Sequence, residues 1–175
     1  MTSPHKSPEK AYASPAVFRG GIGMAMAAAL VYVADRLTKQ AVSSVLAEGE
    51  SVPVIDGVFH ITLVHNPGGA FGVLRAYPQI FTAAAIAFAV IAFLYTIFHW
   101  FSMTLRDKAA ISLLLGGALG NLSDRIRLGY VVDFMDFRVW PVFNVADSCI
   151  SVGAAILILS VITTRRCRED GSCTE

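Results

Sequence analysis

Four long apolar runs divide the chain, and they limit its possible folds more than any other feature of the sequence. The runs are Val17–Ala34, Phe81–Phe98, Ala109–Leu122 and Val145–Ile162. A helix that crosses the hydrocarbon core of a bilayer needs about 20 apolar residues, and three of the four runs nearly reach this length. With 55% hydrophobic and only 15% charged residues, the chain is also more apolar than an ordinary water-soluble domain. The sequence therefore predicts an all-α membrane bundle of four transmembrane helices.

The third run is the shortest of the four. To cross a bilayer, its helix must extend into Ser123, Asp124 and Arg125, and its glycine-rich face would let neighbouring helices approach closely. We therefore expect an inner helix whose outer end carries charge into the protein. A re-entrant hairpin is the alternative that its length leaves open.

The chain divides into one membrane domain, residues 17–164, between polar tails at residues 1–16 and 165–175. The first tail contains three prolines and is expected to be disordered. Basic residues ahead of the first apolar run also resemble a cleavable signal peptide, with Ala25–Ala27 as a possible cleavage site. The motif Asp35–Lys39, which follows this run, favours a retained helix instead.

An even number of spans places both termini on one side of the membrane. Slightly more Lys and Arg residues fall on the terminal side than on the other, which predicts cytoplasmic termini. The long connections 35–80 and 124–144 would then face the periplasm or the cell exterior. Residues 57–65 alternate between two faces and are rich in β-branched and aromatic types, and the turn residues 66–69 follow them. These features predict a small extramembrane β-sheet on the periplasmic side, within residues 36–77.

Charge, cysteine and histidine patterns exclude several functions. A net charge of +1 without a basic stripe gives no sign of nucleic-acid binding. Cys149, Cys167 and Cys173 have no paired spacing and are expected to be free thiols. Neither an H-E-x-x-H zinc motif nor a G-x-S-x-G serine motif is present, so we expect no metal and no cofactor.

Two of the four aspartates near one membrane boundary have simple structural explanations. Asp124 lies near the end of the third helix, where the helix dipole disfavours negative charge, so it needs cationic partners. Arg125 and Arg127 are its neighbours in sequence, which suggests an architectural role. Asp136 would point to the strand face opposite that of Asp133, and we expect it to be solvated or structural.

Asp133 and Asp147 are the stronger candidates for chemistry. Asp133 lies in an apolar, strand-like segment with no capping role and no neighbouring cation in sequence. Asp147 follows Asn144 by three residues at the start of the fourth helix, so it could instead belong to a helix cap. Residue chemistry alone leaves both interpretations of Asp147 open.

A convergent pair of these carboxyls would suit peptide hydrolysis. Two charges about 4 Å apart repel by about 4 kcal/mol at an effective dielectric of about 20. This corresponds to roughly three pK units, enough to raise one carboxyl from about 3.9 to about neutral pH. One carboxylate could then accept a proton from water while its protonated partner polarises the scissile carbonyl.

Five sequence blocks together resemble the signature of the lipoprotein signal peptidases, also called signal peptidase II. The blocks are Asp35–Lys39, Asn66–Phe71, Gly116–Arg125, Gly129–Asp136 and Phe143–Asp147. Each block alone is weak, but the five occur in order along a chain with four apolar runs. The match covers residues 17–162, and Gly69 departs from the alanine that the family often has there.

The resemblance implies an aspartic endopeptidase with Asp133 and Asp147 as its catalytic dyad. Its substrate would be a prolipoprotein bearing a diacylglyceryl-cysteine, embedded in membrane lipid and cut just before that cysteine, and peptide antibiotics such as globomycin would inhibit it. Positions around the substrate and inhibitor pocket would be Asn66, Gly117, Asn121, Asp124, Arg125, Asn144 and Ala146. Supporting positions would be Asp35, Lys39 and Gly68, with an i,i+4 ion pair between Asp35 and Lys39 at the membrane surface.

Two other functions remain possible from residue chemistry. Intramembrane aspartates also build proton relays, so a proton-coupled transporter or channel is the leading alternative. A membrane metalloenzyme is the second, because carboxylates and asparagines can bind magnesium or calcium. The aspartates here lie at helix ends on one side, whereas a transporter predicts charges near helix midpoints and repeated broken helices.

Overall fold

A computed structural model of the chain describes residues 15–68 and 78–169, and the statements below concern these residues. In chain order, the elements are α1 (Pro15–Val45), β1 (Ser51–Ile55), β2 (Phe59–Asn66), α2 (Pro78–His99), α3 (Leu105–Leu128), β3 (Val131–Asp136) and α4 (Val145–Glu169). The first 14 residues, Gly69 and Cys173, on which expectations were stated, lie outside the described residues. Cys149 is a free thiol, as expected.

Three of the four helices are long and apolar enough to cross a membrane. The spans are Gly20–Val45, Thr82–His99 and Val145–Thr163. The helix α1 continues well past its apolar run, so the β part begins at Ser51 rather than near residue 36. The block Asp35–Lys39 therefore lies within α1 and not in the connection after it.

The helix α3 is a single continuous helix at the centre of the bundle. It contains 24 residues, which corresponds to a length of about 36 Å, so the re-entrant hairpin is wrong. Most of its middle residues are buried, and charged residues lie at both of its ends. The predicted inner helix with a charged outer end is confirmed.

Glycines let α3 pack directly against the backbones of α1 and α4. A Cβ atom on Gly116 would lie 2.6 Å from the Ala28 carbonyl oxygen of α1. On Gly117 it would lie 2.5 Å from the Ala146 carbonyl oxygen of α4. These distances are too short for any side chain, so the small residues are required where the helices meet.

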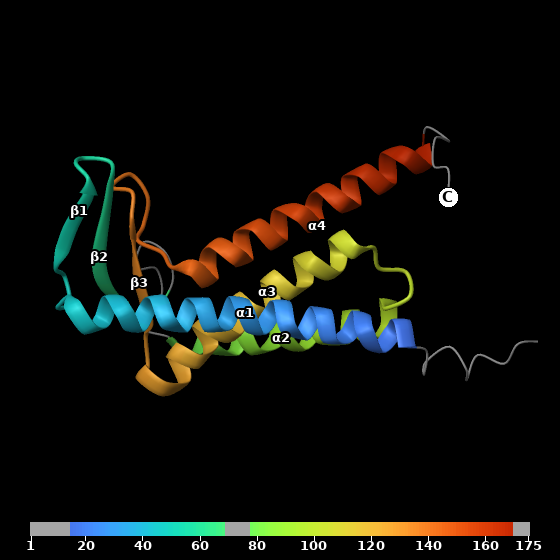
Figure 1. Cartoon of the computed structure of the whole chain (residues 1–175), viewed down its shortest axis with the longest axis horizontal. Helices are drawn as coiled ribbons and strands as arrows, with labels where there is room; N and C mark the ends of the chain where they lie inside the picture. The colour runs from blue at the N-terminus through green and yellow to red at the C-terminus, as the bar shows by residue number, and fades with distance from the viewer. Residues whose placement is uncertain (1–14, 69–77, 170–175) are drawn as a thin grey trace, which may run out of the picture.

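A three-stranded antiparallel sheet, in the order β1-β2-β3, covers one end of the bundle. The start of α1 and the end of α4 both lie at the opposite end (Figure 1). The predicted strand at residues 57–65 is confirmed as β2, the central strand. In β3, Asp133 is paired with Val64 of β2, so the sheet fixes where this aspartate meets the helix ends.

Candidate active site

The carboxylate of Asp133 is held by two asparagine side chains. Its side chain is buried, and β3 directs it toward the start of α4. Asn66, the last residue of β2, donates its amide to Asp133 Oδ2 at 2.9 Å. Asn144, immediately before α4, donates to Asp133 Oδ1 at 2.6 Å. Both carboxylate oxygens are therefore fixed by uncharged donors.

Asp147 forms a reciprocal cap with Asn144 at the start of α4. The Asp147 backbone N–H donates to Asn144 Oδ1 at 2.9 Å, and the Asn144 N–H donates to Asp147 Oδ2 at 3.4 Å. The predicted helix cap is confirmed. Asp147 has a further contact besides this cap, because its other oxygen, Oδ1, accepts a hydrogen bond from the Asn121 side-chain amide at 2.7 Å.

The asparagines also contact one another, which joins the two aspartates in one network. Asn144 Nδ2 donates to Asn121 Oδ1 at 3.1 Å, and the Lys39 ammonium donates to the same oxygen at 2.9 Å. Asn144 and Asn121 are buried, so this hydrogen-bond network is shielded from solvent. It links β3, α3 and α4, the three elements that position the aspartates.

Asp133 and Asp147 face the same small cavity, of about 240 Å³. The sequence could not establish this convergence, and the structure brings the two side chains together. Asn66, Asn121 and Arg125 contribute polar groups to the cavity wall. The remaining lining residues are Val131, Trp140, Pro141, Val142 and Phe143. The sequence analysis did not predict that Trp140 and Phe143 line this cavity. The only indication in the sequence was that both are aromatic residues close to Asn144.

The environment of Asp133 favours its protonated form. Burial raises the pKa of this carboxyl to about 7, and the nearby charge of Asp147 acts in the same direction. Hydrogen bonds from Asn66 and Asn144 oppose the shift because they stabilise the charged form. Asp133 can therefore gain or lose a proton near neutral pH, as acid–base catalysis requires.

A group of buried charged residues lies next to the asparagine network and outside the cavity wall. Lys39 lies 2.7 Å from Asp35 Oδ2 and 2.8 Å from Asp124 Oδ2, and all three side chains are buried. The predicted pair between Asp35 and Lys39 is thus formed, but it lies inside the protein and not at the membrane surface. Asp35 also accepts the backbone N–H of Ala146 at 3.0 Å, which ties α1 to the start of α4.

Asp124 has cationic partners that the sequence did not predict. Its cations are Arg36 and Lys39, both from α1, and its Oδ2 also accepts the Val132 backbone N–H at 3.3 Å. Adjacent residues on a helix point in different directions, so Arg125 lines the cavity while Asp124 faces α1. The predicted architectural role of Asp124 agrees with these contacts, which join α1, α3 and β3.

Three further predicted positions lie beside the cavity rather than in its wall. Gly117 and Ala146 meet where α3 packs on α4, and Ala146 is fully buried. The Gly68 backbone N–H donates to Asn66 Oδ1 at 3.0 Å, which orients the Asn66 amide toward Asp133. These residues support the site through the backbone.

Asp136 is not solvated but has structural partners. It is buried, and it accepts hydrogen bonds from the Thr62 hydroxyl at 2.8 Å and from the Arg138 backbone N–H at 2.8 Å. Burial alone would raise its pKa, but these bonds and the Arg138 guanidinium outweigh burial and lower it. The expectation that Asp136 lies apart from Asp133 and Asp147 agrees with this position.

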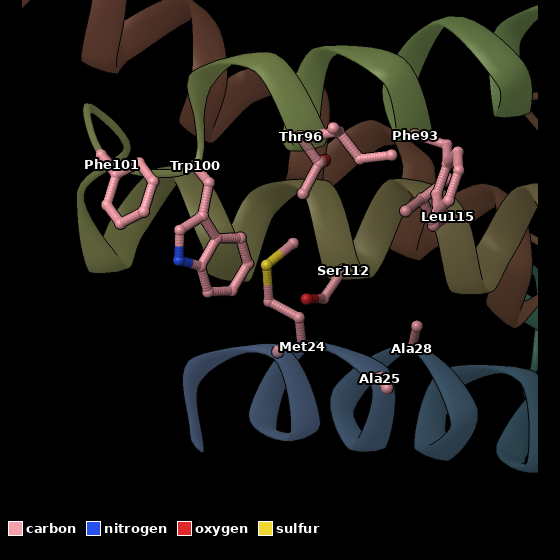
Figure 2. Close-up of a pocket in the computed structure, with 11 residues that line it drawn as sticks. Met24, Ala25, Ala28, Phe93, Thr96, Trp100, Phe101, Ser112 and Leu115 are labelled. Carbon is pink, nitrogen blue, oxygen red and sulfur yellow. The ribbon is translucent and has the colours of Figure 1, made fainter. Parts of the chain in front are cut away.

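A larger cavity, of about 430 Å³, lies between α1, α2 and α3, away from the aspartates (Figure 2). Its lining includes Met24, Phe93, Trp100 and Leu115, and none of its lining residues is titratable. It therefore offers no groups for acid–base chemistry, and the aspartate cavity is the candidate active site.

Comparisons with known proteins identify the family of this chain. Residues 27–163 match the family model described as signal peptidase (SPase) II. The lipoprotein signal peptidase of Halothermothrix orenii is 45% identical over 130 residues, covering 74% of this chain and 88% of the relative. That of Moorella thermoacetica is 46% identical over 134 residues, covering 74% and 86%.

Solved structures show the same fold. One, described as a bacterial membrane enzyme determined by the in meso method at 2.3 Å resolution, superposes with a TM-score of 0.77 at 30% identity. The match covers 87% of this chain and 93% of that structure. By its family model, its relatives and its fold, this chain belongs to the signal peptidase II family, the membrane-embedded proteases of lipoprotein processing.

Proposed function

We propose that this protein is an aspartic endopeptidase that cuts diacylglyceryl-modified prolipoproteins immediately before the lipidated cysteine. The observation that carries the proposal is the placement of Asp133 and Asp147 on one cavity, each held by asparagine amides. Uncharged donors can fix two carboxylates without neutralising them. The pair therefore keeps the capacity to share one proton, which the reaction needs.

In the proposed mechanism, the dyad holds one proton before water attacks. The start of α4 favours negative charge on Asp147, and burial favours the proton on Asp133. Asp147 accepts a proton from the attacking water, and Asp133 donates a hydrogen bond to the scissile carbonyl. The resulting tetrahedral intermediate collapses when a dyad proton passes to the leaving amine, which breaks the C–N bond and releases the lipidated cysteine with a free N-terminus.

The rest of the cavity wall suits an extended peptide. A peptide leaving water must have its backbone amides satisfied in the dry site, and Arg125, Asn66 and Asn121 offer polar groups there. Trp140 and Phe143 add apolar surface next to these groups. We assign this wall to the residues of the precursor on either side of the scissile bond.

We further propose that all four helices cross the bacterial inner membrane, with both termini in the cytoplasm. The sheet and the aspartate cavity would then lie at the periplasmic face, where the precursor signal sequence ends. The common position of the start of α1 and the end of α4 supports this arrangement (Figure 1), as does the distribution of basic residues.

The direct test is cleavage by the purified protein in detergent. A diacylglyceryl-modified precursor should be cut before its modified cysteine, whereas the same precursor without the lipid should be cut poorly. Cleavage should persist in a metal chelator and in a serine-directed reagent, and globomycin should block it. An intact precursor in the absence of inhibitors would favour a transporter, and loss of cleavage in chelator would favour a metalloenzyme.

A further inference from the structure

A groove between α1 and α3 runs along a face of the bundle different from that of the aspartate cavity. Its apolar part has a volume of about 610 Å³ and is lined on α1 by Ala25, Ala28, Ala29 and Tyr32, and on α3 by Leu119, Leu122, Ser123 and Ile126. No residue of α2 or α4 contributes to this lining. Ile126 is 70% exposed, so the groove opens to the surroundings, and α1 is one of the helices apolar enough to cross a membrane.

A polar pocket of about 380 Å³ follows the apolar groove along the same two helices. Its lining includes Arg36, Gln40 and Ser43 of α1, and Arg127 and Leu128 of α3. On α1 the two linings follow one helical face, because their members are spaced three or four residues apart. Groove and pocket therefore form one continuous surface that is apolar at one end and polar at the other.

The polar pocket carries a positive charge that the protein does not neutralise. Arg36 and Lys39 are matched by Asp124 and Asp35. Within the described part of the chain, the exposed Arg127 guanidinium makes no hydrogen bond or ion pair. An unmatched arginine beside an apolar groove, near the end of two helices, suits an anionic group in the headgroup layer.

The dimensions match one leaflet of a bilayer. From Arg36 to Ala25 along α1 is 11 residues, or about 16 Å at 1.5 Å per residue. Half of the hydrocarbon core is about 15 Å. At Ala25 and Ala28 the groove borders the apolar cavity of Figure 2, which shares these two residues and extends toward the start of α1.

We propose that this surface binds one anionic glycerophospholipid, with its phosphate at Arg127 and Arg36 and one acyl chain along the groove past Tyr32. The Tyr32 hydroxyl and Ser123 Oγ, 3.3 Å apart, lie between the two parts and provide polar groups at the depth of the ester linkages. The site is separate from the aspartate cavity and does not depend on the peptidase mechanism.

Native mass spectrometry of the purified protein in detergent tests the proposal. The protein is titrated with phosphatidylglycerol and with phosphatidylcholine of the same acyl chains. Phosphatidylglycerol should bind more tightly, and Arg127→Gln should weaken it by about fivefold while leaving phosphatidylcholine unchanged. Arg106→Gln is the matched control, because Arg106 is exposed at the other end of α3 and outside this surface.

A second pair of variants tests the groove. Ala29→Phe should fill it and weaken both lipids, whereas Ala155→Phe, at an exposed position on α4, should weaken neither. Inorganic phosphate at millimolar concentration should not displace phosphatidylglycerol. The proposal would be overturned if the two lipids bound equally or if Arg106→Gln and Arg127→Gln had equal effects. Displacement of the lipid by free phosphate, or a protein dimer that occupies the groove, would also overturn it.

Discussion

Asn144 donates its side-chain amide to the Asp133 carboxylate at 2.6 Å, while its amide oxygen caps the helix α4. One residue therefore serves both helix stability and the chemistry of the site, and substitutions can separate the two. Asn144→Ser keeps an N-cap oxygen but loses the amide donor, whereas Asn144→Ala loses both. The alanine variant should be less stable than the serine variant by about 1 kcal/mol, as measured by unfolding in detergent. Both variants should lose cleavage activity to a similar extent. An active serine variant would show that Asn144 serves only as a helix cap.

Asp133→Asn and Asp147→Asn should each abolish precursor cleavage while the protein stays folded. Asparagine keeps the size of aspartate but cannot accept the proton of water or share one with its partner, and we expect a loss of about a hundredfold to ten-thousandfold. The double variant should be about as inactive as each single one, because the pair acts as a unit. Asp136→Asn is the matched control. Near wild-type cleavage by Asp147→Asn would reduce Asp147 to a capping residue and reject the aspartic mechanism.

The pH profile of cleavage should be bell-shaped. The active form carries one proton on the dyad, so activity falls at low pH as a second proton binds. It falls again as pH rises through the Asp133 pKa of about 7, because the proton donor is lost. In Asn66→Ala the alkaline limb should move to higher pH, since the lost hydrogen bond had stabilised the charged form and lowered this pKa. A limb that stays in place or moves to lower pH would contradict this assignment.

Asp35→Ala and Asp124→Ala should reduce the amount of folded protein more than the activity per folded molecule. Each removes a carboxylate that faces the buried Lys39 ammonium, and breaking a buried ion pair costs about 3–5 kcal/mol. Arg138→Gln is the control, because its pair with Asp136 is half exposed and such pairs contribute about 0–1 kcal/mol. Thermal melting in detergent gives the comparison. If either alanine variant melts like the wild type yet is inactive, that aspartate belongs to the catalytic set.

Reporter fusions test the membrane orientation. Fusions after Arg106 and Cys167 should report a cytoplasmic location, and a fusion after Lys39 an external one, if four helices cross the membrane with cytoplasmic termini. Charged residues lie at both ends of α3. The Cys167 fusion tests whether this helix crosses, because α3 and α4 both lie between Arg106 and Cys167. An external Cys167 fusion would reject the four-span model.

Local patterns in the sequence were sufficient to predict most of the fold elements. Runs of apolar residues predicted the helices, and alternation in residues 57–65 predicted β2, because both signals depend on neighbouring residues and on the surrounding solvent. The boundaries of α1 were less accurate. Its polar final turns look like a loop in sequence, but Asp35 and Lys39 are helical because they are buried against α3 and α4.

The sequence by itself determined that Asp133 has no local structural purpose and that Asn144 and Asp147 can form a cap, since both conclusions rest on residues close in the chain. Only the tertiary structure decided which charges pair. Asp124 binds Arg36 and Lys39, which lie more than 80 positions earlier in the sequence on α1. It also decided that Asp133 and Asp147 share a cavity, because that depends on how β3 packs over the start of α4, which no local pattern encodes.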